Sequence, residues 1–300
     1  MKRLILGALL LTASAPLAAH GGGHAAPATA PWTFDPILTV PLALVLLLYV
    51  RGLWRLWGRS QRGRATRRRD ALLFGAGWLV LALALTSPLH AGGERSFTLH
   101  MVEHELIMLL ATFLLALSSA GGTMLWGLPA ALESPLASFA RRGPVRALWR
   151  AATGPIVATV LQALALWLWH MPPLFDRALD SFGWHVAQHA SFIASSLLFW
   201  WAMAHARGDR ALLGISALCL FFTSLVGGAL GALMALSDSP WYAPYAAMGV
   251  SGIGLDPVTD QRLAGLIMWI PGGLVHAAAA LYFVHRWLHA AGGQSGLASR

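Results

Sequence analysis

Two pairs of histidines, each with a spacing of four residues, are the features of this sequence best suited to chemistry. His100 and His104 form one pair, and His185 and His189 form the other. Because residues four apart lie on the same face of a helix, each pair can present two imidazoles in one direction. Imidazole nitrogen binds copper, zinc, iron and nickel. The two pairs therefore indicate a metal site shared between two helices.

Further candidate ligands accompany these pairs. Met108 continues the face of the first pair by one helical turn, and His170 ends an apolar segment. Asp260 begins the last apolar segment, and Met268 lies two turns further along the same face. Thioether sulfur favours soft ions, so histidines with methionines within reach favour copper, as Cu(I). The candidate metal ligands are His100, His104, His170, His185, His189, Met108, Asp260 and Met268.

Simpler interpretations stand beside this one. A single histidine at a helix end is often an interfacial residue or a capping aid, so the prediction depends on the pairs acting together. Glu103 and Glu105 either orient the imidazoles or are favourable charges at a helix N-terminus. His276 lies in the middle of an apolar segment. It either forms a structural hydrogen bond or is a second, deeper metal ligand.

The composition indicates a membrane protein. Of the 300 residues, 57% are hydrophobic and 11% are charged, whereas a soluble domain has about 25% charged residues. The formal charge of +9 does not indicate nucleic-acid binding, because the basic residues lie between apolar segments. The one cysteine, Cys219, excludes a disulfide framework or a multi-thiolate metal site within one chain.

Apolar segments of the length of a membrane span follow a predicted signal peptide. A spanning helix needs about 20 mainly apolar residues. We therefore expect an all-α, polytopic transmembrane bundle with about seven spans. The segments are approximately 36–54, 71–89, 101–126, 153–170, 185–206, 211–236 and 262–286.

The ends of the chain complete the predicted organisation. Residues 1–19 have the basic start, apolar middle and small-residue end of a cleaved secretory signal. Residues 20–35 are then an extracytoplasmic tail, 36–290 the seven-helix domain and 291–300 a cytoplasmic tail. Cleavage would make His20 the first residue; its amine and imidazole, with His24 nearby, either chelate copper or belong to a flexible Gly-rich tail.

The arginines predict the orientation of the bundle in the bacterial inner membrane. Short cytoplasmic loops carry an excess of Lys and Arg. With the N-terminus outside and the C-terminus inside, sixteen arginines lie on the cytoplasmic side, and three, Arg95, Arg177 and Arg262, lie outside. The same orientation places all five candidate histidines at the extracytoplasmic ends of their helices.

Four motifs in this order resemble the polytopic CtaG family of cytochrome c oxidase assembly factors, a seven-span membrane family. The resemblance covers about residues 35–290. The motifs are His100-Met-Val-Glu-His104, Trp169-His170-Met-Pro-Pro-Leu-Phe-Asp176, Trp184-His185-Val-Ala-Gln-His189 and Asp260-Gln-Arg-Leu-Ala-Gly265.

The resemblance implies a role in maturing haem-copper oxidases by delivering copper to the binuclear centre, without enzymatic activity. It implies an oxidase subunit and a periplasmic copper carrier as partners within the lipid bilayer, and no nucleic acid. The motif histidines and Asp260 carry over as the family's functional residues.

Two other functions are consistent with the residues alone. Histidines from two helices can ligate haem b in a membrane electron carrier. A transporter of metal or solute is the other, with Pro271-Gly-Gly273 as a mobile break in the last helix. Hydrolase or hydride-transfer activity is not expected, because the corresponding motifs are missing from the sequence.

Overall fold

The computed structural model describes residues 31–59, 63–206 and 210–295, and the described part contains helices and connecting loops but no strand. The predicted signal peptide, His20 and His24 lie outside the described residues. The expected all-α membrane bundle is confirmed.

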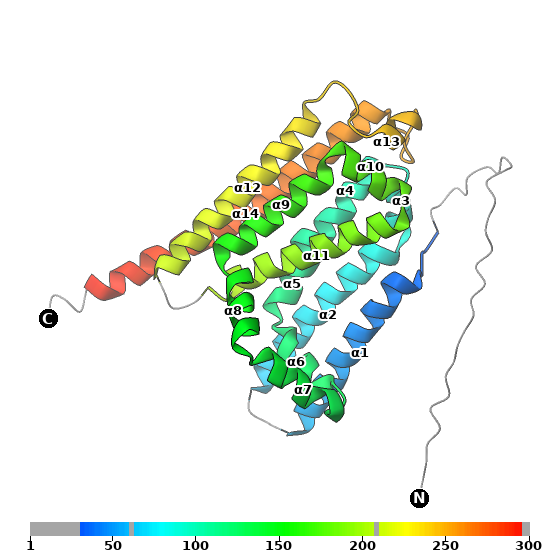
Figure 1. Cartoon of the computed structure of the whole chain (residues 1–300). Coiled ribbons are helices and arrows are strands. Elements are labelled where there is room, and N and C mark those ends of the chain that lie inside the picture. Colours follow the sequence, from blue (N-terminus) through cyan, green and yellow to red (C-terminus); the bar gives the residue numbers. More distant parts are fainter. Residues whose placement is uncertain (1–30, 60–62, 207–209, 296–300) are drawn as a thin grey trace, which may run out of the picture.

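Each of the seven apolar segments falls on a helix of the bundle (Figure 1). The third is built from α4, a π-helical turn η1 and α5, which together span Phe97–Leu117. The helices are α1 (Pro36–Arg59), α2 (Arg64–Thr86), α4 (Phe97–Glu105), η1 (Leu106–Ala111), α5 (Thr112–Leu117), α9 (Pro155–His170), α11 (Phe182–Ala204), α12 (Arg210–Ala235) and α14 (Pro257–Ser295).

Five of these helical segments are long and apolar enough to cross a membrane. A sixth is obtained if α8 (Gly143–Ala152) and α9, bent by 67° relative to each other, count as one span. Helix α11 is not in this set. Multiple membrane spans are therefore established, whereas the count of seven stays a prediction. Large apolar side chains such as Leu164, Leu218 and Leu274 are exposed on the outer surface, as expected where lipid replaces water.

The expected third helix, 101–126, is wrong at its C-terminal end. The helix ends at Leu117 because Ser119 adopts a left-handed conformation with φ of 49°, which does not continue a right-handed helix. Residues beyond it form the separate helix α6 (Ala120–Gly127), which packs against α1. The last helix is longer than expected and continues through Ser295.

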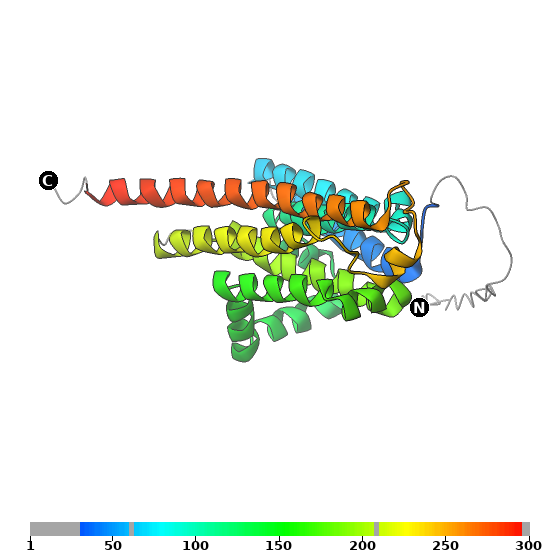
Figure 2. The ribbon, with the colours of Figure 1, turned by 90° about the horizontal axis from the view of Figure 1, so that it is seen from above.

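Short helices gather at opposite ends of the bundle (Figure 1). At one end lie α3 (Pro88–Gly93), α10 (Pro172–Asp180) and α13 (Ala243–Ala247); at the other lie α6, α7 (Ala130–Ala140) and α8. We call the first the histidine end, because α4 and α11 begin there and α9 ends there. Helix α14 runs alongside α12 and extends past the other end of the bundle (Figure 2).

Helices α12 and α14 form the most extensive helix pair, and glycine allows their backbones to meet. Gly231 of α12 faces Gly265 of α14 across the pair. Small residues at such crossings let helices in lipid approach closely. This contact fixes the N-terminal half of α14, which carries Asp260 and Met268, relative to the rest of the bundle.

Replacing Gly231 by alanine is expected to force α12 and α14 apart. The added Cβ would lie 2.7 Å from the carbonyl oxygen of Gly265, and backbone atoms cannot rotate away. Overpacking costs about 1–3 kcal/mol, so thermal unfolding in detergent should show a midpoint lower by about 2–4 °C for each kcal/mol. The control is Gly227→Ala, whose Cβ would meet only Leu166 Cδ2 at 3.8 Å. An equal decrease in both variants would contradict the prediction.

Candidate metal centre

Six histidines converge at the histidine end of the bundle. Five are the predicted candidates, and the sixth, His90, comes from the short helix α3. Ser87 caps this helix by accepting a hydrogen bond from the amide of Leu89, and Pro88 occupies its first turn. The six are His90 on α3, His100 and His104 on α4, His170 on α9, and His185 and His189 on α11.

The imidazoles form two overlapping groups of three. In one group, nitrogens of His90, His185 and His189 all lie within 4.8 Å of one another. In the other, the same holds for His100, His104 and His189. His185 is partly exposed, whereas the other members are buried. His189 is thus shared between an outer group that reaches the surface and an inner group that does not.

His170 lies beside the inner group rather than within it. Its ring centroid is 6.2 Å from that of His104, and its Nδ1 lies 2.7 Å from the carbonyl oxygen of Leu166. A carbonyl can only accept, so Nδ1 carries the proton and Nε2 has a free lone pair. This Nε2 is buried and has no hydrogen-bond partner among the described residues.

Tyr245 of α13 fixes the orientation of His100 in a similar way. The phenol donates its hydrogen to the carbonyl of Gly93 at 2.6 Å, and His100 Nδ1 lies 3.1 Å from the phenol oxygen. Burial, together with the nearby charges of Asp260 and Glu103, raises the pKa of Tyr245, so the phenol stays protonated. His100 Nδ1 must then donate, which leaves Nε2 as the unprotonated nitrogen.

Within the part of the chain that the structure describes, Glu103 is the carboxylate that contacts the imidazoles. It is fully buried, with Oε1 located 2.7 Å from His90 Nδ1 and 3.6 Å from His189 Nε2. Burial lowers the pKa of His90, but the hydrogen bond and charge of Glu103 outweigh this, so the pKa is raised. A carboxylate that holds one ring nitrogen while the other remains available is a common arrangement behind metal-binding histidines.

The cluster fits a metal ion in donor type and nearly in spacing. Among the described residues, buried ring nitrogens without a hydrogen-bond partner are present on five of the histidines, namely His100, His104, His170, His185 and His189. Bonds from a metal to imidazole of about 2.0–2.1 Å place neighbouring ligand atoms about 3.3 Å apart in a tetrahedron. The 4.8 Å limit therefore requires only small side-chain rotations to close either group.

Asp260, predicted as a ligand, instead holds the N-terminus of α4. One carboxylate oxygen accepts hydrogen bonds from the Ser96 hydroxyl at 2.9 Å and the Thr98 amide at 3.2 Å. The other accepts from the Phe97 amide at 2.7 Å. These are the groups that a helix start leaves unsatisfied, so Asp260 positions the first histidine pair by anchoring the helix that carries it.

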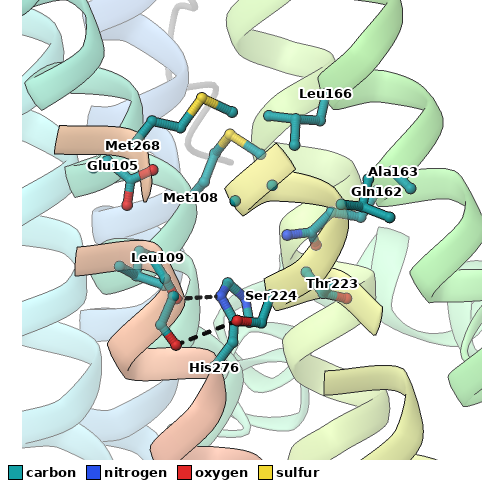
Figure 3. Close-up of a pocket in the computed structure, with 15 residues that line it drawn as sticks. Glu105, Met108, Leu109, Gln162, Ala163, Leu166, Thr223, Ser224, Met268 and His276 are labelled. Atoms are coloured by element: carbon teal, nitrogen blue, oxygen red, sulfur yellow. Dashed lines mark hydrogen bonds between the residues drawn. The ribbon is translucent and has the colours of Figure 1, made fainter. Parts of the chain in front are cut away.

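Met108 and Met268 lie together, but below the cluster. Both line a cavity of about 50 Å³ that also contains Glu105 and His276 (Figure 3). None of the six clustered histidines is among the described residues that line this cavity. The structure thus separates the predicted ligand set into a nitrogen-rich cluster and a deeper, sulfur-containing cavity.

His90 and Tyr245 were missed by the sequence analysis. His90 has no histidine four residues away, and it follows the expected end of the second helix by one residue. The pair Ser87-Pro88 is the signal that would have found it, because this is a typical helix start. Tyr245 lies in a long connection between apolar segments, and its contact with His100 spans 145 residues, so no local pattern indicates it.

Comparison with known proteins gives one match. The family model described as cytochrome c oxidase caa3 assembly factor (Caa3_CtaG) matches residues 47–290. This range includes all six histidines and most of the helical bundle. No curated protein and no solved structure matches.

Asp260→Asn tests whether this residue is an anchor or a ligand. Asparagine loses the charge and presents a donor toward amides that also donate; hydrogen bonds to charged groups contribute about 1.5–3 kcal/mol. We expect a lower midpoint of thermal unfolding in detergent and unchanged metal content per folded molecule. The control is Asp238→Asn, which removes only an exposed ion pair with Arg262. Metal loss with unchanged stability would identify Asp260 as a ligand.

Proposed function

The chain belongs to the cytochrome c oxidase caa3 assembly factor family, and on this premise we propose that its histidine cluster binds copper and delivers it to a haem-copper oxidase subunit. The family establishes the assembly role and the membrane environment. Copper as the cargo is inferred from the chemistry of the cluster. The histidine end would face the extracytoplasmic side of the bacterial inner membrane, where a periplasmic carrier can supply the ion.

The observation that carries this proposal is the set of buried, unpartnered imidazole nitrogens. A buried polar atom without a hydrogen bond costs about 1–3 kcal/mol, and five histidines bear such nitrogens within one cluster. A bound ligand would satisfy these atoms and offset that cost. Three nitrogen donors within 4.8 Å of one another suit a transition-metal ion.

The charge of the cluster favours a monovalent ion. Glu103 is the carboxylate in direct contact with the imidazoles, and it would balance the single charge of Cu(I). A divalent ion in the same place would leave an uncompensated charge in a buried site, which is costly. Cu(I) also accepts two or three nitrogen ligands readily, so either group of three is sufficient.

Sharing of His189 between the two groups supports transfer rather than permanent storage. An ion held by His90, His185 and His189 at the partly exposed surface can exchange two ligands for His100 and His104 while His189 stays bound. Reversal of the same steps returns it to the surface. An assembly factor needs this property, because its cargo must leave for the oxidase.

The first test is copper content after loading the detergent-purified, reduced protein. We expect His100→Ala/His104→Ala/His189→Ala to bind about one equivalent less Cu(I) than the wild type, because it removes the inner group and the shared ligand. The matched control is His205→Ala/His285→Ala/His289→Ala, three exposed histidines at the other end of the bundle. Mass spectrometry gives the metal, and a thermal unfolding scan checks folding.

The same purified samples, together with a vesicle assay, distinguish the competing functions. A visible spectrum with stoichiometric haem that disappears in the first variant would replace copper delivery by electron transfer. Equal copper content in the wild type and both variants would remove the cluster as the binding site. Metal flux into vesicles that depends on Gly272 and Gly273 would favour a transporter.

Glu103→Gln should weaken binding without changing its stoichiometry. Glutamine keeps the length of the side chain and can accept the hydrogen bond from His90, but it lacks the compensating charge. Mutation of residues that orient metal ligands typically lowers the affinity for the metal about 10–100-fold. We expect an increase of this size in the Kd for Cu(I), measured by competition with a chelator. Glu94→Gln, an exposed glutamate near the same end, is the control. An unchanged Kd would contradict the role of Glu103.

A further inference from the structure

The cavity beneath the histidine cluster has its own set of possible ligands. It lies one helical turn deeper in the bundle, because Met108 follows His104 by four residues and Leu166 precedes His170 by four. Its volume of about 50 Å³ has room for an ion or a few waters. Figure 3 shows side chains from η1, α9, α12 and α14 around it.

His276 brings an oriented imidazole to this cavity. Its Nδ1 lies 2.7 Å from the carbonyl oxygen of Gly272, so Nδ1 donates and Nε2 is unprotonated. The ring stacks on Trp200 with centroids 5.3 Å apart and an interplanar angle of 11°. Only 8% of the residue is exposed, and Nε2 has no hydrogen-bond partner in the described part of the chain. The hydrogen bond to Gly272 accounts for Nδ1 of His276 but not for the buried Nε2.

The π-helical turn fixes the position of Met108. Its carbonyl oxygen accepts hydrogen bonds from Trp200 Nε1 at 2.9 Å and from the Thr112 hydroxyl at 2.7 Å. Single π-helical turns inside α-helices are frequent at functional sites. Trp200 thus holds both Met108, through this hydrogen bond, and His276, through ring stacking. One buried side chain therefore positions a residue at each end of the cavity.

Met268 and Glu105 complete the cavity. Met268 is almost fully buried on α14, and its thioether joins that of Met108 along the wall (Figure 3). Glu105 lies against Gly272, where an added Cβ would meet its Oε2 at 3.5 Å. A carboxylate within a spanning segment is costly unless a positive charge or a proton neutralises it. The described residues provide no cationic partner for it.

We propose that this cavity is a second metal site, which binds one soft monovalent cation, Cu(I) or its analogue Ag(I). The thioether sulfurs of Met108 and Met268, which lie together at one end of the cavity, are the ligands, and Glu105 is the compensating charge; His276 lines the opposite end (Figure 3). Two thioethers select against hard cations such as Na⁺ or Mg²⁺, which require oxygen ligands. Binding here does not depend on the histidine cluster; the use of the site as a next station for the same ion rests on the function proposed above.

The test removes the histidine cluster and asks what the cavity still binds. The full chain with His100→Ala/His104→Ala/His189→Ala is purified in detergent, reduced and titrated with Ag(I) or Cu(I). We expect one equivalent to remain, with sulfur neighbours in its X-ray absorption spectrum. Adding Met108→Leu/Met268→Leu should abolish it, since leucine keeps the volume but has no sulfur. The matched control adds Met203→Leu/Met234→Leu, two buried methionines that do not line the cavity.

A second measurement needs no substitution in the cavity. Chain labelled with selenomethionine and loaded with one to two equivalents of Cu(I) should show a copper neighbour in the selenium absorption spectrum. Absence of that neighbour, or a remaining ion with only nitrogen and oxygen neighbours, would overturn the sulfur-containing site. Equal binding by the Met108→Leu/Met268→Leu protein and its control would do the same. Failure of the histidine-cluster proposal is seen separately, as undiminished stoichiometry in the triple histidine variant.

Discussion

The geometry of the histidine cluster depends on one carboxylate that joins the last helix to the start of α4. Asp260 accepts hydrogen bonds from the Ser96 hydroxyl and from the amides of Phe97 and Thr98, and the Thr98 hydroxyl donates to the Asp260 carbonyl. A helix that starts within the protein must satisfy its first amides from outside the helix. Because α14 supplies this partner, the rotation and depth of α4 are set relative to α14. This alignment fixes the positions of the histidines of α4 and of Met108 relative to Met268 on α14.

The second constraint is the burial of imidazole nitrogens that have no hydrogen-bond partner among the described residues. It relates the structure of the cluster to the proposed exchange of a bound ion. Each ring nitrogen held by a hydrogen bond to a carbonyl, a phenol or Glu103 leaves its opposite nitrogen free, so the protein specifies which atom can bind metal. A group of neutral donors with only one adjacent carboxylate binds a monovalent ion without accumulating charge. Such a site releases its ion more easily than one built from several carboxylates or thiolates, which would attract the ion strongly from every side. The small number of charged groups beside the cluster, among the described residues, therefore favours the transfer that we propose over permanent storage.

Hydropathy and histidine spacing were sufficient to predict the helical membrane bundle and five of the six clustered histidines, whereas the orientation predicted from the arginines stays a prediction. These features are local or depend on average composition. What the sequence could not provide are contacts set by tertiary packing: His90 has no periodic partner, and Tyr245 meets His100 only because α13 folds over the histidine end. Asp260 and the methionines were predicted as ligands from their helical spacing, but spacing along a helix does not give the depth or the contacts of a side chain. Met108 lies one turn too deep to join the cluster, and Asp260 is engaged by backbone amides. The end of the third helix before Ser119 could not be predicted, because serine gives no strong sequence signal for a left-handed conformation.

Helix α11, one of the helices that form the histidine cluster, is not apolar enough to qualify as a membrane span. Helix α11 carries His185 and His189, and it buries Gln188, Ser195 and Ser196 among its apolar residues. It is absent from the helices that qualify as spans by length and hydropathy, although the expected seven-span topology requires it to cross. Polar side chains of this kind are tolerated in a bundle when they face its interior, and α11 packs against α5 and α9. Its two histidines and its buried polar residues lower its mean hydropathy. The same side chains that would hold the proposed ion therefore place this helix outside the set of apolar spans.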